Sequence, residues 1–253
     1  MMAPVPIYYA QGTPFFRSQL VRQPYLSLYK MAVKVLMALL ILVGTRAMAA
    51  VADLYVADFS SGSVFKFTPT GAKATFATGL GQPSGLAFDP KGNLFVTDSL
   101  NGVIYKITPA GVKSVFIAGL SNPFGLAFDS NGNLFEADSG RGEIFKITPT
   151  GSVSALATGL NGPAGLAIDA ANNVYETDFF SGTIFRFSAS GAKSTLATGL
   201  QNPDGIYSDR RGNLFEADLS SGRILSIAPT GLKTVVATGF SAPAGVAVFR
   251  PVP

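Results

Sequence analysis

The 253-residue sequence contains no cysteine and no histidine, and only 13% of its residues are charged. Without cysteine the fold cannot use disulfide bonds, and no thiolate can act as a metal ligand or nucleophile. Without histidine, the chain lacks the commonest metal ligand and the side chain that usually transfers protons near neutral pH. These absences exclude several classes of metal centre and enzyme, whereas 47% hydrophobic residues suffice for a globular core.

The net charge of +4 comes from the first 50 residues, which carry five cations and no acid. Residues 51–253 hold 14 cations and 15 acids, so this part of the chain is almost neutral. A neutral body offers no broad electrostatic footprint for nucleic acid or for an anionic membrane. We therefore expect no nucleic-acid partner.

Residues 31–49 have the pattern of a secretory signal peptide. Lys30 and Lys34 precede an apolar run, VLMALLILVG. This run is followed by the small-residue sequence AMA at positions 47–49. Ten apolar residues suit the core of a signal peptide, whereas a membrane span needs about 20. We expect cleavage after Ala49 or Ala50, export to the periplasm, cell surface or medium, and no stable membrane span after cleavage. An uncleaved N-terminal anchor is the alternative.

Residues 1–30 are rich in proline and aromatic residues and show neither helical nor strand periodicity. They fit no part of a signal peptide. We interpret them as an upstream extension outside the fold, with translation beginning at Met31, and we expect a single folded domain over residues 50–253.

A unit of 40 residues is repeated five times after residue 50. One aspartate recurs at this spacing, as does a proline that is followed two residues later by glycine. The aspartates are Asp58, Asp98, Asp138, Asp178 and Asp218, and the prolines are Pro83, Pro123, Pro163, Pro203 and Pro243. Five copies without an insertion indicate a repeat architecture.

Each unit predicts four short strands separated by turn residues. In residues 125–158 the expected strands are GLAFD, NLFEAD, EIFKIT and SVSALAT, which are rich in aliphatic and aromatic residues. The connections are of hairpin length, and glycine and proline occur where turns need them. Each unit is therefore predicted to be a four-stranded antiparallel meander.

Four strands in about 40 residues are typical of a β-propeller blade. The repeat begins within a unit, because residues 51–58 align with the second strand and residues 242–249 with the first. We predict an all-β, five-bladed propeller in which the C-terminal first strand joins the N-terminal second, third and fourth strands in one closing blade. This closure would protect sheet edges that an open array would expose. A six-bladed ring is the alternative.

The repeat motif P-x-G-L-A-x-D-x-x-G-N-L-[FY]-x-[AT]-D, followed by G-x-[IV]-[FY]-[KR]-[IF], resembles that of NHL-repeat propellers and covers nearly all of residues 51–249. The wider superfamily includes gluconolactonase and regucalcin-like metal-dependent lactonases and virginiamycin B lyase. The resemblance implies the fold strongly. It implies little about function, since propellers host both binding and catalysis.

The resemblance allows the metal ligands of gluconolactonase-like proteins to be compared with the residues of this sequence. In gluconolactonase-like proteins a divalent cation is held by a Glu, two Asn and an Asp that lies in a PDG sequence. Residues 202–209, NPDGIYSD, place Asp204 at that position, but a hard cation needs about six oxygen ligands. The equivalent residues of the other units are Ser84, Phe124, Ala164 and Ala244. Asp204 is thus only a weak metal candidate. For the lyase of this superfamily, the resemblance implies a catalytic histidine, which the chain lacks.

Three units carry a glutamate within the second strand, where two others have valine. These residues are Glu136, Glu176 and Glu216. A functional interpretation is a crescent of carboxylates approaching the channel, able to hold a cation or sugar hydroxyls. A structural interpretation, which we favour, is a set of cross-strand ion pairs with Lys146 and Arg186. Glu216 has no such partner, and the hairpin should bring Asp204 close to Asp218.

We expect an exported binding module that takes an unidentified small molecule or protein at one mouth of the channel. No catalytic constellation is recognisable, no cofactor is expected, and the protein should be a monomer. A metal-dependent gluconolactonase-like hydrolase with a degenerate site, or a structural envelope component, are the alternatives. The candidate ligand-binding residues are Asp204, Glu216, Asp218, Glu176 and Glu136.

Overall fold

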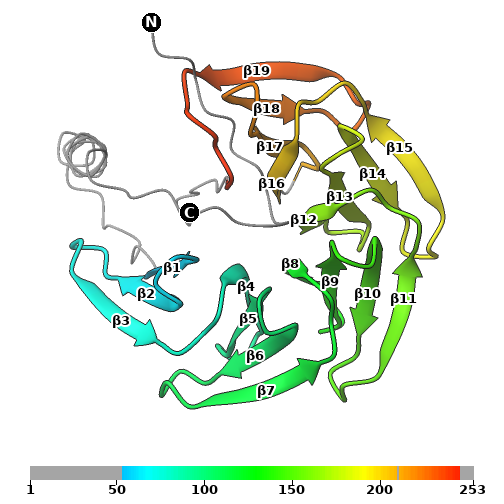
Figure 1. The fold of residues 1–253 in the computed structure, drawn as a ribbon. Coiled ribbons are helices and arrows are strands. Elements are labelled where there is room, and N and C mark those ends of the chain that lie inside the picture. Colours follow the sequence, from blue (N-terminus) through cyan, green and yellow to red (C-terminus); the bar gives the residue numbers. More distant parts are fainter. Residues whose placement is uncertain (1–52, 210, 246–253) are drawn as a thin grey trace, which may run out of the picture. The chain divides into compact units, whose positions relative to one another are not determined.

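The computed structural model describes residues 53–209 and 211–245, which form five antiparallel sheets (Figure 1). All described residues belong to one compact unit. No helix in these two ranges is long and apolar enough to cross a membrane. The predictions for the signal peptide, its cleavage and residues 1–30 concern residues outside the described ranges.

The sheets follow one another along the chain and are numbered here as blades 1 to 5. Blade 1 contains β1 (Leu54–Asp58), β2 (Ser63–Phe67) and β3 (Lys73–Ala77). Blade 2 contains β4 (Pro83–Phe88), β5 (Leu94–Asp98), β6 (Val103–Ile107) and β7 (Lys113–Ala118). Blade 3 contains β8 (Pro123–Phe128), β9 (Leu134–Asp138), β10 (Glu143–Ile147) and β11 (Val153–Ala157). Blade 4 contains β12 (Pro163–Ile168), β13 (Val174–Asp178), β14 (Thr183–Phe187) and β15 (Lys193–Ala197). Blade 5 contains β16 (Pro203–Ser208), β17 (Leu214–Asp218), β18 (Arg223–Ile227) and β19 (Lys233–Thr238).

Each four-stranded blade is an antiparallel meander whose strands pair in sequence order. The first strand of these blades lies innermost and the fourth lies outermost (Figure 1). The predicted all-β, five-bladed propeller is therefore confirmed. The first strand begins at the proline, two residues earlier than expected, because proline is compatible with the first position of a strand.

The hairpin between the first and second strands is fixed by an aspartate. In blade 3 the Asp129 carboxylate accepts hydrogen bonds from the backbone N–H groups of Asn131 (2.9 Å) and Asn133 (2.8 Å) and from the Asn133 side chain (2.7 Å). Gly132 completes this turn with a φ of 80°, which glycine adopts without strain. These local bonds explain the repeated D-x-x-G-N sequence, which is a turn signal and not a calcium loop.

Neighbouring blades approach most closely at the glycine of the P-x-G sequence. A Cβ atom on Gly125 would lie 2.3 Å from the carbonyl oxygen of Ala164 in the next blade. A Cβ atom on Gly205 would lie 2.5 Å from the carbonyl oxygen of Ala244. Ala244 in the C-terminal segment thus contacts β16 in the way that Ala164 at the start of blade 4 contacts β8. Its predicted pairing with β1 in the closing blade involves residues 246–249, which lie outside the described ranges.

The apolar core lies between the blades. Phe95 and Ile104 of blade 2 pack with Leu126, Leu134 and Phe145 of blade 3. The second strands of blades 2, 3 and 4 are buried at every position, whereas the fourth strands are largely exposed. A polar side chain on the second strand of blades 2, 3 or 4 is therefore enclosed between two sheets.

Candidate functional site

The aspartate at the end of the second strand is a structural connector in blades 2 to 5. The Asp138 carboxylate is fully buried and accepts hydrogen bonds from the backbone N–H groups of Ser121 (2.8 Å), Asn122 (3.1 Å) and Arg141 (3.0 Å). Ser121 and Asn122 belong to the connection from the preceding blade, and Arg141 belongs to the next turn. One carboxylate thus joins three segments of the chain.

Asp218, which the sequence predicts as a ligand-binding residue, makes the same connection. Its carboxylate accepts hydrogen bonds from the backbone N–H groups of Gln201 (2.9 Å) and Ser221 (3.3 Å), and the residue is buried. Asp218 therefore holds the start of blade 5 to its hairpin.

The three glutamates of the second strands, Glu136, Glu176 and Glu216, are completely buried, at 0% exposure. Glu136 lies opposite Leu126 on one side and opposite Phe145 on the other, so it shares a face with two apolar residues. Among the described residues, the six carboxylate oxygens of these glutamates have no hydrogen-bond partner of good geometry, although the backbone of Phe124 comes close enough to Glu136 to oppose a rise of its pKa. Their carboxyl groups are therefore shielded from water.

The favoured interpretation of these glutamates as cross-strand ion pairs is wrong. The register places Lys146 opposite Phe135 and Arg186 opposite Tyr175, one residue away from the glutamates. Since side chains alternate between the faces of a strand, one residue of offset puts acid and cation on opposite faces. The Lys146 ammonium lies 5.8 Å from the centre of the Phe135 ring instead.

Burial sets the protonation state of the glutamates. It raises the pKa of Glu136 to about 9, assisted by the negative charge of Asp138 and opposed by Arg141 and the backbone of Phe124. Burial and Asp178 raise the pKa of Glu176 to about 9. Burial, Asp218 and Asp204 raise the pKa of Glu216 to about 8. In the absence of a ligand, these pKa values favour the uncharged form of the three acids at neutral pH.

Asp204 differs from the glutamates because it lies on an innermost strand and is only partly buried. The register pairs Pro203 with Asp218 and Ile206 with Glu216, and a bulge between them leaves Asp204 without a direct partner. Burial raises the pKa of Asp204 to about 6. No hydrogen bond or ion pair joins its carboxylate to another described residue.

The structure brings Asp204 and Glu216 together, since the negative charge of Asp204 raises the pKa of Glu216. Asp218, on the same strand as Glu216, raises the pKa of Glu216 in the same way. The hairpin prediction concerned Asp204 and Asp218, and the register pairs Asp218 with Pro203, the neighbour of Asp204. Glu136 and Glu176 belong to blades 3 and 4 and each interact with the aspartate of their own strand. The predicted set is therefore one local group in blade 5 and two separate buried acids.

The residues around Asp204 do not fit a divalent cation. Within residues 53–209 and 211–245, no group of three or more acidic side chains is arranged to hold a metal ion. The positions equivalent to Asp204 hold Ser84, Phe124 and Ala164, of which only serine offers a side-chain oxygen. A calcium-like ion needs 6–8 oxygen ligands, and the three glutamates are completely buried between sheets.

Two threonines join neighbouring blades and were missed by the sequence analysis. The Thr97 hydroxyl accepts a hydrogen bond from the Gly85 N–H (2.7 Å) and donates one to the Phe124 carbonyl of the next blade (2.8 Å). Thr177 makes the same two bonds, to Gly165 and to Asp204. The sequence did contain a signal for these bonds. Two units have threonine at a position where the other three have alanine, at residues 57, 137 and 217.

The fold and the inner strands define the chain as a five-bladed β-propeller. Residues 41–158 match the family model of the SMP-30/gluconolactonase/LRE-like region. This match confirms the resemblance to the gluconolactonase-like propeller superfamily. No curated protein matches the sequence significantly.

Three solved structures illustrate the range of similar propellers. A gluconolactonase from Xanthomonas campestris has 18% identity and a TM-score of 0.69, with 76% of this chain and 74% of that chain covered. Virginiamycin B lyase from Staphylococcus aureus has 16% identity and a TM-score of 0.66, with 80% and 71% covered. An auxiliary nutrient binding protein from Bacteroides ovatus has 15% identity and a TM-score of 0.66, with 77% and 60% covered. At these identities the similarity shows the fold alone.

Proposed function

We propose that the protein is an exported propeller that binds a small molecule or a protein beside Asp204, at the mouth of its channel, and does not hydrolyse lactones. The supporting observation is the Asp204 carboxylate, which is partly exposed, has no partner among the described residues, and has a pKa raised to about 6. A perturbed and unpaired acid on an innermost strand is a candidate binding group. The auxiliary nutrient binding protein of similar fold supports this proposal.

Lactonase activity would require a cation near Asp204. Among the described residues, Asp204 acts on Glu216, which is fully buried and has a pKa of about 8. The partly exposed Asp204 carboxylate can accept hydrogen bonds from a hydroxyl or amine of a ligand. It does not form the coordination sphere of a hard cation.

Lyase activity is also disfavoured. A histidine-to-alanine variant of the Staphylococcus aureus virginiamycin B lyase is catalytically inactive, and this chain contains no histidine. The similarity to that enzyme therefore supports only the shared architecture.

The experiment measures the melting temperature in millimolar calcium, magnesium, manganese or zinc, together with hydrolysis of glucono-lactone. A cation at 100 times its dissociation constant would stabilise the native state by about 2.7 kcal/mol, which corresponds to a shift of roughly 5–10 °C. We expect a shift within experimental error and hydrolysis at background. A clear shift that is lost in Asp204→Asn, or hydrolysis lost in the same variant, would replace this proposal by the degenerate hydrolase.

The hydrolase is retained as the second candidate because Asp204 and Glu216 interact in blade 5. A purely structural role in the envelope is supported by no described contact. It would be favoured if the Asp204 region could be changed without affecting any binding activity of the protein.

A further inference from the structure

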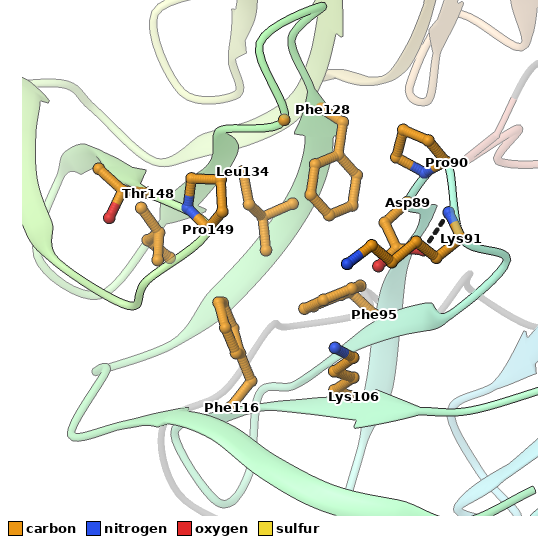
Figure 2. A pocket seen from close by; sticks show the side chains of 12 residues that line it. Asp89, Pro90, Lys91, Phe95, Lys106, Phe116, Phe128, Leu134, Thr148 and Pro149 are labelled. Carbon is orange, nitrogen blue, oxygen red and sulfur yellow. Dashed lines mark hydrogen bonds between the residues drawn. The ribbon is translucent and has the colours of Figure 1, made fainter.

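A groove of about 270 Å³ lies between blades 2 and 3, at the opposite end of the blades from Asp204. Asp204 lies where an innermost strand starts, whereas this groove is bordered by the turns that follow β4, β8 and β10. We call it groove 2/3. Its lining includes Asp89, Pro90, Lys91, Phe95, Lys106 and Phe116 (Figure 2).

The apolar wall of groove 2/3 consists of the partly buried Phe116 and Phe128, which pack against the buried ring of Phe95. The ring centres of Phe95 and Phe116 are 4.9 Å apart at an interplanar angle of 86°, and those of Phe95 and Phe128 are 5.1 Å apart at 76°. Both pairs are edge-to-face, which is the arrangement that aromatic rings prefer. An aromatic ring of a ligand would find the same type of partner here.

Two lysines give the groove its positive charge. Figure 2 shows the side chains of Lys91 and Lys106 extending toward the Phe95 ring, and the Lys106 ammonium lies 5.7 Å from the ring centre. Among the described residues, neither ammonium lies within 4.0 Å of a carboxylate, because the ion pairs there are Lys66–Asp53 and Arg141–Asp138.

Asp89 offsets only one of these two charges, and its oxygens already have partners. Its carboxylate accepts hydrogen bonds from the backbone N–H groups of Lys91 (2.9 Å) and Asn93 (2.8 Å) and from the Asn93 side chain (2.7 Å). The groove therefore carries a net positive charge beside an apolar wall, which is the complement of an amphipathic anion.

The corresponding junction of blades 3 and 4 is bridged by hydrogen bonds. The Ser130 N–H donates to the Asn172 side-chain oxygen (3.0 Å), and the Asn172 side-chain NH₂ donates to the Ser130 hydroxyl (2.9 Å). In groove 2/3 the same two positions are Pro90 and Gly132. Proline has no N–H and glycine has no side chain, so neither bond can form, and the two turns are left unconnected.

We propose that groove 2/3 binds a small aromatic carboxylate, with its ring against the partly exposed Phe116 and Phe128 and its carboxylate beside Lys91 and Lys106. The size is appropriate, since an apolar cavity of about 150 Å³ can hold a benzene molecule. The remaining volume holds a short chain and the acid group. Charge-assisted hydrogen bonds to two ammonium groups then favour the anion over a neutral molecule of the same shape.

Ligand-observed NMR titration of the full chain with 3-phenylpropionate tests the proposal. We expect saturable binding with a Kd of about 1 mM or below, as an eleven-atom ligand of ordinary efficiency would give. The neutral analogue 3-phenyl-1-propanol and the ringless propionate should each bind at least about tenfold more weakly, because each lacks one of the two complementary features.

Substitutions assign the binding to this groove. Lys91→Met and Lys106→Met should each weaken binding about tenfold, whereas Lys146→Met should not, because Lys146 occupies the position of Lys106 in the next blade. The double variant Pro90→Ser with Gly132→Asn transplants the bridge of blades 3 and 4 and should abolish binding. Asparagine tolerates this turn, as Asn172 has a φ of 60°.

Two results overturn the proposal. One is an absence of saturable binding by the unchanged protein, and the other is binding that is equally strong for the neutral alcohol or is unaffected by both single lysine substitutions. The lysine variants change exposed or partly exposed side chains, so their melting temperatures should match the unchanged protein. The proposal does not depend on Asp204, and either proposal can fail without the other.

Discussion

Blades 2 and 3 carry different residues at one enclosed position of the repeat. Val96 and Glu136 both lie in the middle of a second strand and both have 0% exposure. Their strand neighbours are similar, with Leu86 and Tyr105 opposite Val96, and Leu126 and Phe145 opposite Glu136. The same architecture therefore accepts an aliphatic chain or a carboxylic acid. The comparison shows that the acid is tolerated in its neutral form, since burial raises its pKa to about 9.

The largest expected consequence is a loss of stability as the pH rises. The glutamates have a pKa of 4.5 in the unfolded chain, against about 9, 9 and 8 in the folded protein. The folded state thus binds more protons between these values, so the stabilisation is full below pH 4.5 and is lost as the pH rises toward 8–9. Each group contributes up to about 1.4 kcal/mol per pH unit. Urea unfolding followed by circular dichroism from pH 5 to pH 8 measures this loss.

Glutamine substitutions isolate the glutamates in this measurement. A variant with glutamine at positions 136, 176 and 216 should lose most of the pH dependence, and Glu176→Gln alone should lose about a third of it. Glu143→Gln is the matched control, because Glu143 is on β10 but only partly buried, and it should leave the slope unchanged. A stability that is constant or rises between pH 5 and pH 8 would mean that the three acids are not enclosed.

A smaller effect is expected when blade 2 is given the buried glutamate that blade 3 has. Val96→Glu places an acid without partners in blade 2 and should destabilise the protein by about 2–4 kcal/mol at pH 7. The loss should be smaller at pH 5, where less free energy is needed to keep the acid neutral. Val96→Thr, which buries a polar group that does not titrate, should cost the same at both pH values. Identical pH behaviour of the two variants would show that the positions in blades 2 and 3 are not equivalent.

The sequence was sufficient to predict the blades because their signals are local and repeated. The turn residues Asp129 and Gly132 bound the hairpin, and the 40-residue period gives the number of sheets. The residue pairing across strands was less accessible. Glu136 and Lys146 are ten residues apart, but the register pairs Glu136 with Phe145, and a shift of one residue reverses the face of a side chain.

Contacts between blades could not be read from the sequence for a different physical reason. The bridge between Ser130 and Asn172 joins residues 42 apart, and its absence between blades 2 and 3 depends on Pro90 and Gly132, which look like ordinary turn residues. Likewise, the bulge between Pro203 and Ile206 determines where Asp204 lies, and no residue pattern marks it. Only the packing of two sheets shows which turns meet.

The smallest expected effect distinguishes Glu216 from Glu136. Above pH 6 Asp204 carries a negative charge beside Glu216, and this charge opposes ionisation of the glutamate. Asp204→Asn removes the charge while keeping the size of the side chain, so the pKa of Glu216 should fall below about 8. Glu136 is an internal reference, because the position equivalent to Asp204 in its blade is Phe124, and its pKa should stay at about 9. Carbon-13 NMR titration of the glutamate carboxyl groups measures both values in one sample. If both pKa values remain unchanged, Asp204 and Glu216 do not interact. The protonation of Glu216 would then have no effect on a ligand that binds beside Asp204.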